Sequence, residues 1–222
     1  MIPIGDDDVR GAGPPVVTWL LIVVNVLAFL FELTLSPPEL EQFFMTFGVV
    51  PAQIQQGDNL LALLTSMFLH GGWLHIVSNM LFLWVFGNNI EAVLGKTLYL
   101  LFYLAGGLAA SVIHIIFNLG SNIPSVGASG AIAAVLGAYI VLFPRSQVRV
   151  LVISFYMGVT RVAAIVFLGF WFIIQLFTGV ASLGAQTAQT GGVAFWAHIG
   201  GFVFGVLVAL LMRGQTRQVR YS

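Results

Sequence analysis

Ser129 and His198 are the residues whose types are best suited to nucleophilic chemistry in this sequence. A serine hydroxyl attacks a carbonyl carbon only when a nearby base takes its proton, and a neutral imidazole is the usual base near neutral pH. The attack creates an oxyanion, which hydrogen-bond donors must stabilise; the Asn79 amide, the His75 imidazole and the Ser129 backbone N–H are suitable donors. These residues predict an acyl-transfer site.

Other polar residues leave alternatives open. A single serine in a membrane helix more often bonds a backbone carbonyl or a neighbouring helix than performs chemistry, and His114 is a rival base. His70 is interpreted as an interfacial residue. His70 and His75 lack a third metal ligand, so we expect no metal ion and no cofactor. Of the carboxylates, only Glu32 could stand near the level of the serine. Because no other acidic residue is available there to orient a histidine, a Ser-His dyad is favoured over a triad with an acidic third member.

The composition places these residues in a membrane protein. The chain has 222 residues, of which 59% are hydrophobic and only 7% are charged. That is too little polar surface to coat a soluble globule of this size. The net charge is zero and the basic residues are dispersed, so no basic patch for nucleic acid is present. Cysteine is absent, which excludes disulfides and thiolate metal sites.

Apolar runs long enough to cross the bilayer recur along the chain. A helix of about 20 residues spans the roughly 30 Å of hydrocarbon. The first run is too long for a signal-peptide core and is expected to be retained as a span. We predict an all-α polytopic protein with a single membrane domain over residues 1–222. Its six spans lie near 16–35, 70–90, 97–117, 127–143, 162–182 and 193–212.

All eight basic residues fall on one side of these six spans. They are Arg10, Lys96, Arg145, Arg149, Arg161, Arg213, Arg217 and Arg220. Cytoplasmic loops carry an excess of Lys and Arg, so both termini are predicted to be cytoplasmic. The opposite connections contain neither residue type; they are 36–69, 118–126 and 183–192. The first is expected to hold short helices on the outer membrane surface, and 150–160 is interpreted as an interfacial segment of undefined shape.

The basic residues also supply a ruler for depth. Ser129 lies 16 residues before Arg145. His198 lies 15 residues before Arg213. At about 1.5 Å per helical residue, both side chains stand about 22 to 24 Å above the inner boundary. We therefore predict that they share one level, several ångströms below the outer surface.

Two further features support a site at this level. Asn79 lies 17 residues before Lys96, or about 25 Å on the same scale, and His75 is one turn further out on the same helix face. Small residues surround both proposed catalytic side chains and allow close helix contact. These small residues are Gly127, Gly130, Ala197, Gly201 and Gly205.

Four motifs, in order, resemble the rhomboid intramembrane serine proteases of bacterial type, with their six-helix core. The resemblance covers all six spans. The motifs read His70-Gly-Gly-Trp-Leu-His75-Ile-Val-Ser-Asn79, Gly87-xxx-Glu91-xxx-Gly95, Gly127-Ala128-Ser129-Gly130 and Ala197-His198-Ile-Gly-Gly201-xxx-Gly205. The resemblance implies that Ser129 is the nucleophile and His198 the general base and acid. It also implies that His75, Asn79 and the Ser129 N–H stabilise the oxyanion.

The resemblance further implies a substrate class and a route of entry. Family substrates are transmembrane segments that are cut near their outer end, often after a small residue and near helix-destabilising residues. The outer loop 183–192 would cap a water-accessible cavity, and substrate would enter beside the fifth span. That span carries Phe167, Phe170, Trp171 and Phe172. The expected location is the inner membrane of a bacterial cell, with the site opening outward; the sequence does not define the oligomeric state.

Two positions depart from the family pattern. Many members carry a Trp-Arg pair before the second span, where this chain reads Leu60-Leu61-Ala62-Leu63. Some members have an aromatic residue four places after the nucleophile that packs on the catalytic histidine, and this position is Ala133 here. The competing hypotheses are a catalytically silent rhomboid-like binder of membrane helices and a transporter or proton channel. The silent relatives typically lack the serine or the histidine, and few buried carboxylates argue against ion transport.

Overall fold

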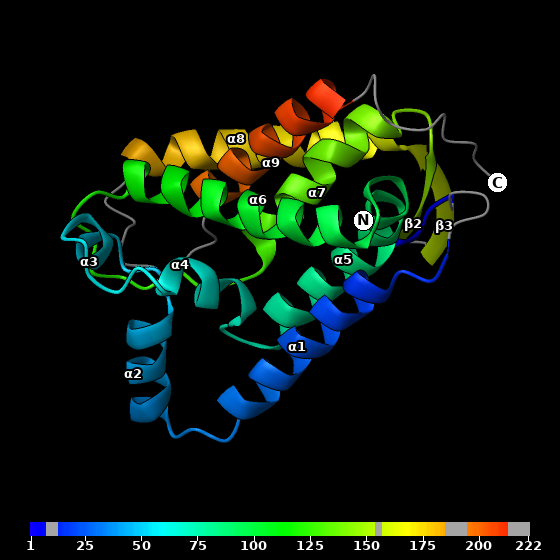
Figure 1. Ribbon diagram of the computed structural model, residues 1–222. Helices are drawn as coiled ribbons and strands as arrows, with labels where there is room; N and C mark the ends of the chain where they lie inside the picture. The colour runs from blue at the N-terminus through cyan, green and yellow to red at the C-terminus, as the bar shows by residue number, and fades with distance from the viewer. Residues whose placement is uncertain (8–12, 154–156, 185–194, 213–222) are drawn as a thin grey trace.

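Helices make up most of the chain. The computed structural model describes residues 1–7, 13–153, 157–184 and 195–212. Six long or apolar helices pack together (Figure 1). They are α1 (Val16–Glu32), α5 (Trp73–Leu94), α6 (Lys96–Phe117), α7 (Ser129–Leu142), α8 (Ala164–Gly184) and α9 (Phe195–Met212). Each predicted span overlaps one of these helices.

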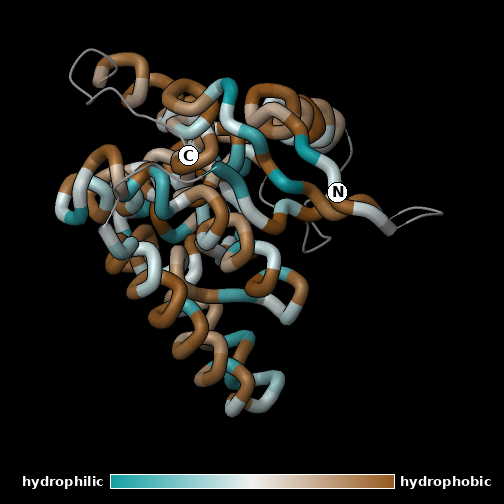
Figure 2. The backbone as a smooth tube through the Cα atoms, turned by 90° about the vertical axis from the view of Figure 1, so that its right-hand side faces the viewer, coloured by the Kyte–Doolittle hydropathy of each residue, from teal (hydrophilic) through white to brown (hydrophobic). Residues whose placement is uncertain are grey.

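Helix length separates the six into two groups. Four helices in the described part of the chain are long and apolar enough to cross a membrane, namely α5, α6, α8 and α9. The apolar helices α1 and α7 are shorter, with 17 and 14 residues. Figure 2 shows that hydrophobic residues predominate along the helices. This agrees with a mostly helical membrane protein.

Helix α7 forms the centre of the bundle. Residues 130–139 are all buried, so no face of this stretch remains open. Such all-round burial is expected of a helix that is apolar on every side. Helices α5, α6, α8 and α9 each contact α7. The Ser129 end of α7 is therefore held by a shell of neighbouring helices.

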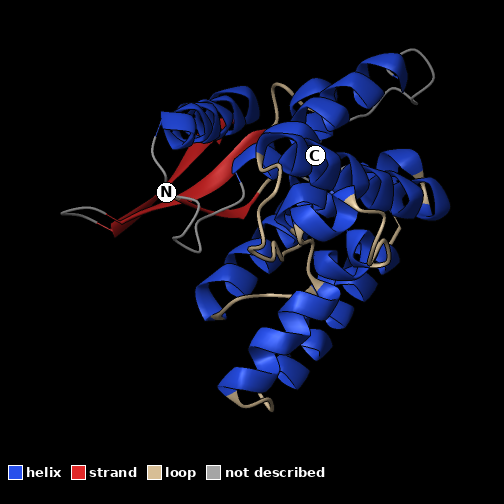
Figure 3. Cartoon of the chain, turned by 90° about the vertical axis from the view of Figure 1, so that its left-hand side faces the viewer, coloured by secondary structure: helices blue, strands red, loops and turns tan. Residues whose placement is uncertain are grey.

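A small antiparallel sheet corrects the all-α prediction. Strands β1 (Ile2–Gly5), β2 (Gln147–Ile153) and β3 (Met157–Ala163) pair in the order β1-β2-β3, with Arg149 opposite Arg161. Figure 3 shows the three strands beside the helices. Val148 and Val150 are buried while Arg149 between them is exposed, which is the two-residue alternation of a strand. The segment 150–160 therefore belongs to a hairpin, apart from residues 154–156, which lie outside the described residues.

Buried carboxylates tie the helices together at the sheet end. Helix α1 has no acidic residue in its first turn and no side-chain cap of its own. Glu91, near the end of α5, accepts hydrogen bonds from the backbone N–H groups of Val17 and Thr18 at 2.9 and 2.8 Å. It also accepts one from the Thr18 hydroxyl at 2.8 Å. Glu91 thereby satisfies free N–H groups at a helix start, where negative charge is favourable.

The N-terminal strand is fixed by a second buried carboxylate. Asp6 accepts hydrogen bonds from the Tyr139 hydroxyl of α7 and from the Asn89 amide of α5, the latter at 2.8 Å. The Tyr139 hydroxyl also lies 2.9 Å from the Ser146 hydroxyl. This network connects β1 to the ends of α5 and α7.

Among the basic residues of the predicted inner side, Arg10, Arg213, Arg217 and Arg220 lie outside the described residues.

The connection between α1 and α5 holds short helices, as predicted. They are α2 (Pro37–Phe47), α3 (Pro51–Gln55), α4 (Ala62–Thr65) and the 3-10 helix η1 (Ser66–Phe68). A capping box begins α2, in which the Ser36 hydroxyl and backbone N–H donate to Glu39. These bonds lower the pKa of the exposed Glu39 carboxyl. No residue of α2 is buried, so α2 extends away from the bundle (Figure 1).

Candidate active site

The loop before α7 places Ser129 as the first residue of that helix. Val49 and Ser125 exchange backbone hydrogen bonds of 2.9 and 2.8 Å, and Gly127 N–H donates to the Ser66 carbonyl at 2.8 Å. Gly127 has a φ of +133°, which glycine adopts far more readily than other residues. A Cβ at Gly127 would lie 2.7 Å from His75 Nε2 and 3.6 Å from Ser129 Oγ. The missing side chain thus leaves a small space that both His75 and Ser129 border.

Ser129 and His198 are in direct contact. Their Oγ and Nε2 atoms are 2.7 Å apart, within hydrogen-bond distance. His198 lies in α9 and is 6% exposed. The structure therefore brings the two predicted catalytic side chains together, although 69 residues separate them in the sequence.

Glycines make this contact between α7 and α9 possible. A Cβ at Gly201 would overlap the carbonyl oxygen of Gly130, and a Cβ at Gly205 would overlap that of Ala134. A Cβ at Gly137 would likewise overlap the Phe202 carbonyl oxygen. The two backbones touch directly, as expected for small residues at a helix interface in a membrane. The predicted small-residue face of the last span is this interface.

His75 and Asn79 lie one turn apart on α5. Asn79 is 7% exposed, and its Nδ2 is 3.0 Å from His70 Nε2. The rings of His70 and His75 meet edge to face with centroids 5.1 Å apart. In the described part of the chain, no hydrogen bond joins Asn79 to Ser129 or His198. The amide of Asn79 is therefore held by His70.

His70 is not interfacial, and that prediction is wrong. It is 1% exposed, and its backbone N–H donates to the two carboxylate oxygens of Glu32 at 3.1 and 3.3 Å. Glu32 itself is 2% exposed. Within the described residues, Glu32 makes no hydrogen bond to Ser129 or His198. This carboxylate holds the chain at the start of the His70 motif and does not orient His198.

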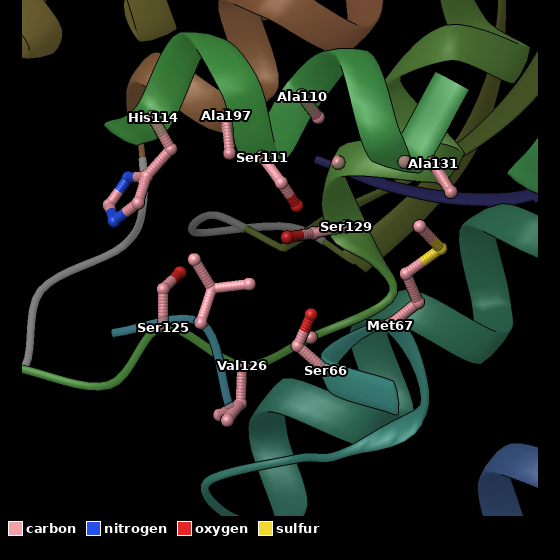
Figure 4. Close-up of a pocket in the computed structure, with 14 residues that line it drawn as sticks. Ser66, Met67, Ala110, Ser111, His114, Ser125, Val126, Ser129, Ala131 and Ala197 are labelled. Carbon is pink, nitrogen blue, oxygen red and sulfur yellow. The ribbon is translucent and has the colours of Figure 1, made fainter. Parts of the chain in front are cut away.

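His114, the rival base, lines a small cavity next to the serine. Its Nδ1 is 3.4 Å from the Asn118 amide, and no hydrogen bond between His114 and Ser129 is seen in the part that the structure describes. The cavity has a volume of about 30 Å³, enough for one or two water molecules. Figure 4 shows the Ser129 hydroxyl in this space, with three further serines around it. These are Ser66, Ser111 and Ser125.

Sequence reasoning missed the residue on the other side of His198. Gln175 of α8 places its Oε1 2.9 Å from His198 Nδ1. Trp171, one turn earlier on α8, has its ring centroid 5.8 Å from that of His198. Counting residues from the basic side could have placed Gln175 near the depth of the dyad, because it lies 14 residues after Arg161, or about 21 Å along a helix. Of the predicted cap 183–192, residues 185–192 lie outside the described residues.

Residues 57–215 match the family model of the Rhomboid domain. The chain belongs to the rhomboid family. It is 36% identical over 138 residues to the rhomboid protease GluP of Bacillus subtilis, covering 61% of this chain and 26% of the relative. It is 28% identical over 200 residues to rhomboid protein 1, mitochondrial, of Saccharomyces cerevisiae. This match covers 87% of this chain and 52% of the relative.

A third rhomboid relative comes from an animal. The presenilin-associated rhomboid-like protein A, mitochondrial, of Danio rerio is 32% identical over 151 residues, covering 66% of this chain and 36% of the relative. The matches thus span between about a quarter and a half of the lengths of these relatives. The matched residues include His75, Asn79, Ser129 and His198. The chain is therefore an integral membrane protein that is homologous to rhomboid proteases.

Proposed function

We propose that this protein is an intramembrane serine endopeptidase that cleaves transmembrane segments of other membrane proteins. The observation that carries the proposal is the 2.7 Å distance between Ser129 Oγ and His198 Nε2. A nucleophile and a base within hydrogen-bond reach are the geometric requirement for acyl transfer. Membership of a family that includes proteases supports the same function.

The proposed reaction proceeds through an acyl-enzyme. His198 Nε2 takes the Ser129 proton as Oγ bonds to the carbonyl carbon of the scissile peptide, which forms a tetrahedral oxyanion. His198 then gives that proton to the leaving nitrogen, and the peptide C–N bond breaks. A water molecule next attacks the ester while His198 takes its proton. Return of this proton to Ser129 Oγ releases the carboxylic acid product and restores the free enzyme.

Donors for the oxyanion come from two elements. Ser129 is the first residue of α7, and its N–H makes no backbone hydrogen bond to any described residue. Such a free N–H at a helix start is suited to an oxyanion. His75 and Ser129 border the same space beside Gly127, and Asn79, one turn along α5 from His75, supplies a further donor. We assign these three groups to oxyanion stabilisation.

We further propose the orientation of this single domain, residues 1–222, in a bacterial inner membrane. Arg149 and Arg161 lie in the sheet, at the opposite end of α7 from Ser129. An excess of basic residues marks the cytoplasmic side. Both termini are then cytoplasmic, and the dyad opens towards the outer surface. The lipid bilayer and transmembrane substrates are the partners of this arrangement.

The decisive experiment compares Ser129→Ala with a matched serine variant. The purified protein in liposomes is expected to cleave a single-span model substrate, whereas Ser129→Ala is expected to lose this cleavage. Ser78→Ala is the control, because Ser78 is exposed and bonds only backbone carbonyls of its own helix. Cleavage by Ser129→Ala at the rate of the control would overturn the proposal.

A fluorophosphonate probe separates the protease from a silent binder. The protease is expected to react covalently at Ser129, and mass spectrometry of the labelled peptide identifies the position. A folded wild-type protein that captures a membrane helix but neither cleaves it nor takes up the probe is instead a binder. Thermal unfolding of each variant establishes that the protein is folded.

A further inference from the structure

Three polar side chains, one from each of three helices, are connected by hydrogen-bond contacts at the proposed site. Gln175 Oε1 on α8 is 2.9 Å from His198 Nδ1 on α9, and His198 Nε2 is 2.7 Å from Ser129 Oγ on α7. An amide oxygen only accepts hydrogen bonds. A tautomer with the ring proton on His198 Nδ1 satisfies both contacts, because Nδ1 then donates to Gln175 and Nε2 accepts from the serine hydroxyl. The bond to Gln175 selects the tautomer that a general base needs.

The packing of α8 on α9 fixes Gln175 in this position. Gly179 follows one turn after Gln175, and a Cβ there would lie only 3.1 Å from Ile199 Cδ1. On the other side of Gln175, the rings of Phe172 and Phe202 stack with centroids 4.4 Å apart. Close contacts thus hold α8 on both sides of the amide.

The exposure pattern of α8 places Gln175 on its inner face. Gln175 is half-buried, whereas neighbouring apolar residues are exposed. Exposed fractions are 50% for Ile173, 46% for Ile174 and 75% for Phe177. A polar side chain on a helix in lipid normally faces the bundle and finds a partner there. His198 is the partner that the structure gives to Gln175.

The ring of His198 has little other support. The position on α7 at which some rhomboid proteases carry an aromatic residue is Ala133, which is fully buried and offers only a methyl group. The Trp171 ring contacts His198 from α8, the helix that also carries Gln175. Among the described residues, the hydrogen-bond partners of the His198 ring are Ser129 and Gln175, and neither is a carboxylate. Orientation of the imidazole therefore depends on α8.

We infer that Gln175 is a positioning residue that orients His198 as the base for Ser129. This inference rests on the proposed protease function and adds a third member, from α8, to the dyad. A neutral amide fixes the ring and its tautomer without adding a buried charge. It plays the orienting part that a carboxylate plays in a triad.

Kinetics of two Gln175 variants test the inference. Gln175→Leu removes the acceptor and is expected to lower kcat by about 10- to 100-fold with little change in KM. Gln175→Glu keeps an acceptor, so it is expected to retain most of kcat. Its acid limb of the pH–rate profile is expected to move to higher pH, because a carboxylate stabilises the imidazolium. Thr178→Val is the matched control, since Thr178 is half-buried on α8 and bonds only the Ile174 carbonyl of its own helix.

The outcomes separate a positioning role from packing. A Gln175→Leu variant with the kcat of Thr178→Val overturns the inference while leaving the protease proposal intact. Equal losses in Gln175→Leu and Gln175→Glu with an unshifted pH profile also overturn it, because packing alone explains them.

A readout that needs no cleavage completes the test. In ¹⁵N-histidine-labelled protein, NMR is expected to find His198 protonated at Nδ1, and a mixture of tautomers in Gln175→Leu. An unchanged tautomer in that variant refutes the inference whether or not the protein is a protease.

Discussion

Gly201→Ala tests whether backbone contact between α7 and α9 sets the geometry of the dyad. The added Cβ would overlap the Gly130 carbonyl oxygen and lie 3.1 Å from its carbon, so the two backbones must separate by about 1 Å to regain ordinary contact. His198 is one turn from Gly201, and Ser129 adjoins Gly130. A shift of that size would stretch the 2.7 Å Oγ–Nε2 distance beyond hydrogen-bond range.

The expected loss of activity follows from this displacement. A misplacement of about 1 Å costs on the order of 100-fold in rate, and overpacking of this kind lowers the free energy of unfolding by about 1 to 3 kcal/mol. We therefore expect kcat for a single-span substrate in liposomes to fall about 100-fold while Gly201→Ala remains folded. Denaturant unfolding in detergent measures the accompanying loss of stability.

Gly169→Ala is the matched control, because a Cβ at Gly169 on α8 meets no atom within 4 Å. It is expected to retain wild-type activity and to be no less stable, since alanine favours helix more than glycine does. Wild-type kcat in Gly201→Ala would refute the argument, because the site would then tolerate separation of the two helices. So would an equal loss of kcat in both glycine variants.

Three further substitutions probe the buried carboxylates. Glu91→Ala removes three hydrogen bonds from the start of α1 and is expected to lower the free energy of unfolding by about 2 to 4 kcal/mol; an unchanged denaturation midpoint would contradict this role. Asp6→Ala removes the acceptor of Tyr139 and should speed amide exchange in β1, measured by hydrogen–deuterium exchange, whereas equal protection would count against the tether. Glu32→Ala frees the His70 backbone N–H and is expected to lower kcat about tenfold; full activity would mean that this anchor does not position the α5 donors.

Sequence patterns predicted the helices better than the sheet. Long apolar runs are a direct signal because a helix needs about 20 apolar residues to cross the bilayer, and each of the six predicted spans overlaps a helix. The strands were missed because 147–163 is short, apolar and rich in valine, and such a run does not reveal its pairing partner. That partner, β1, lies more than 140 residues away in the sequence.

The candidate site was predictable where depth alone decided. Ser129 and His198 stand at one level on the ruler, and their contact agrees with that prediction. His70 was misinterpreted because its burial depends on Glu32, whose position relative to the second span no spacing reveals. Gln175 was missed because a single amide in an apolar helix gives no indication of which neighbour it faces.

The short, enclosed helix α7 has a consequence for the order in which the protein can assemble. Its 14 residues measure about 21 Å, which is less than the roughly 30 Å of hydrocarbon, and Gly201 and Gly205 of α9 pack directly on its backbone. During synthesis, α7 is made before α9, so the face of α7 that packs on α9 has no partner until α9 inserts. Ser129 meets His198 only after α9 inserts. Under the proposed function, a nascent chain is therefore inactive until α9 is in place, and a truncation before α9 leaves the dyad incomplete.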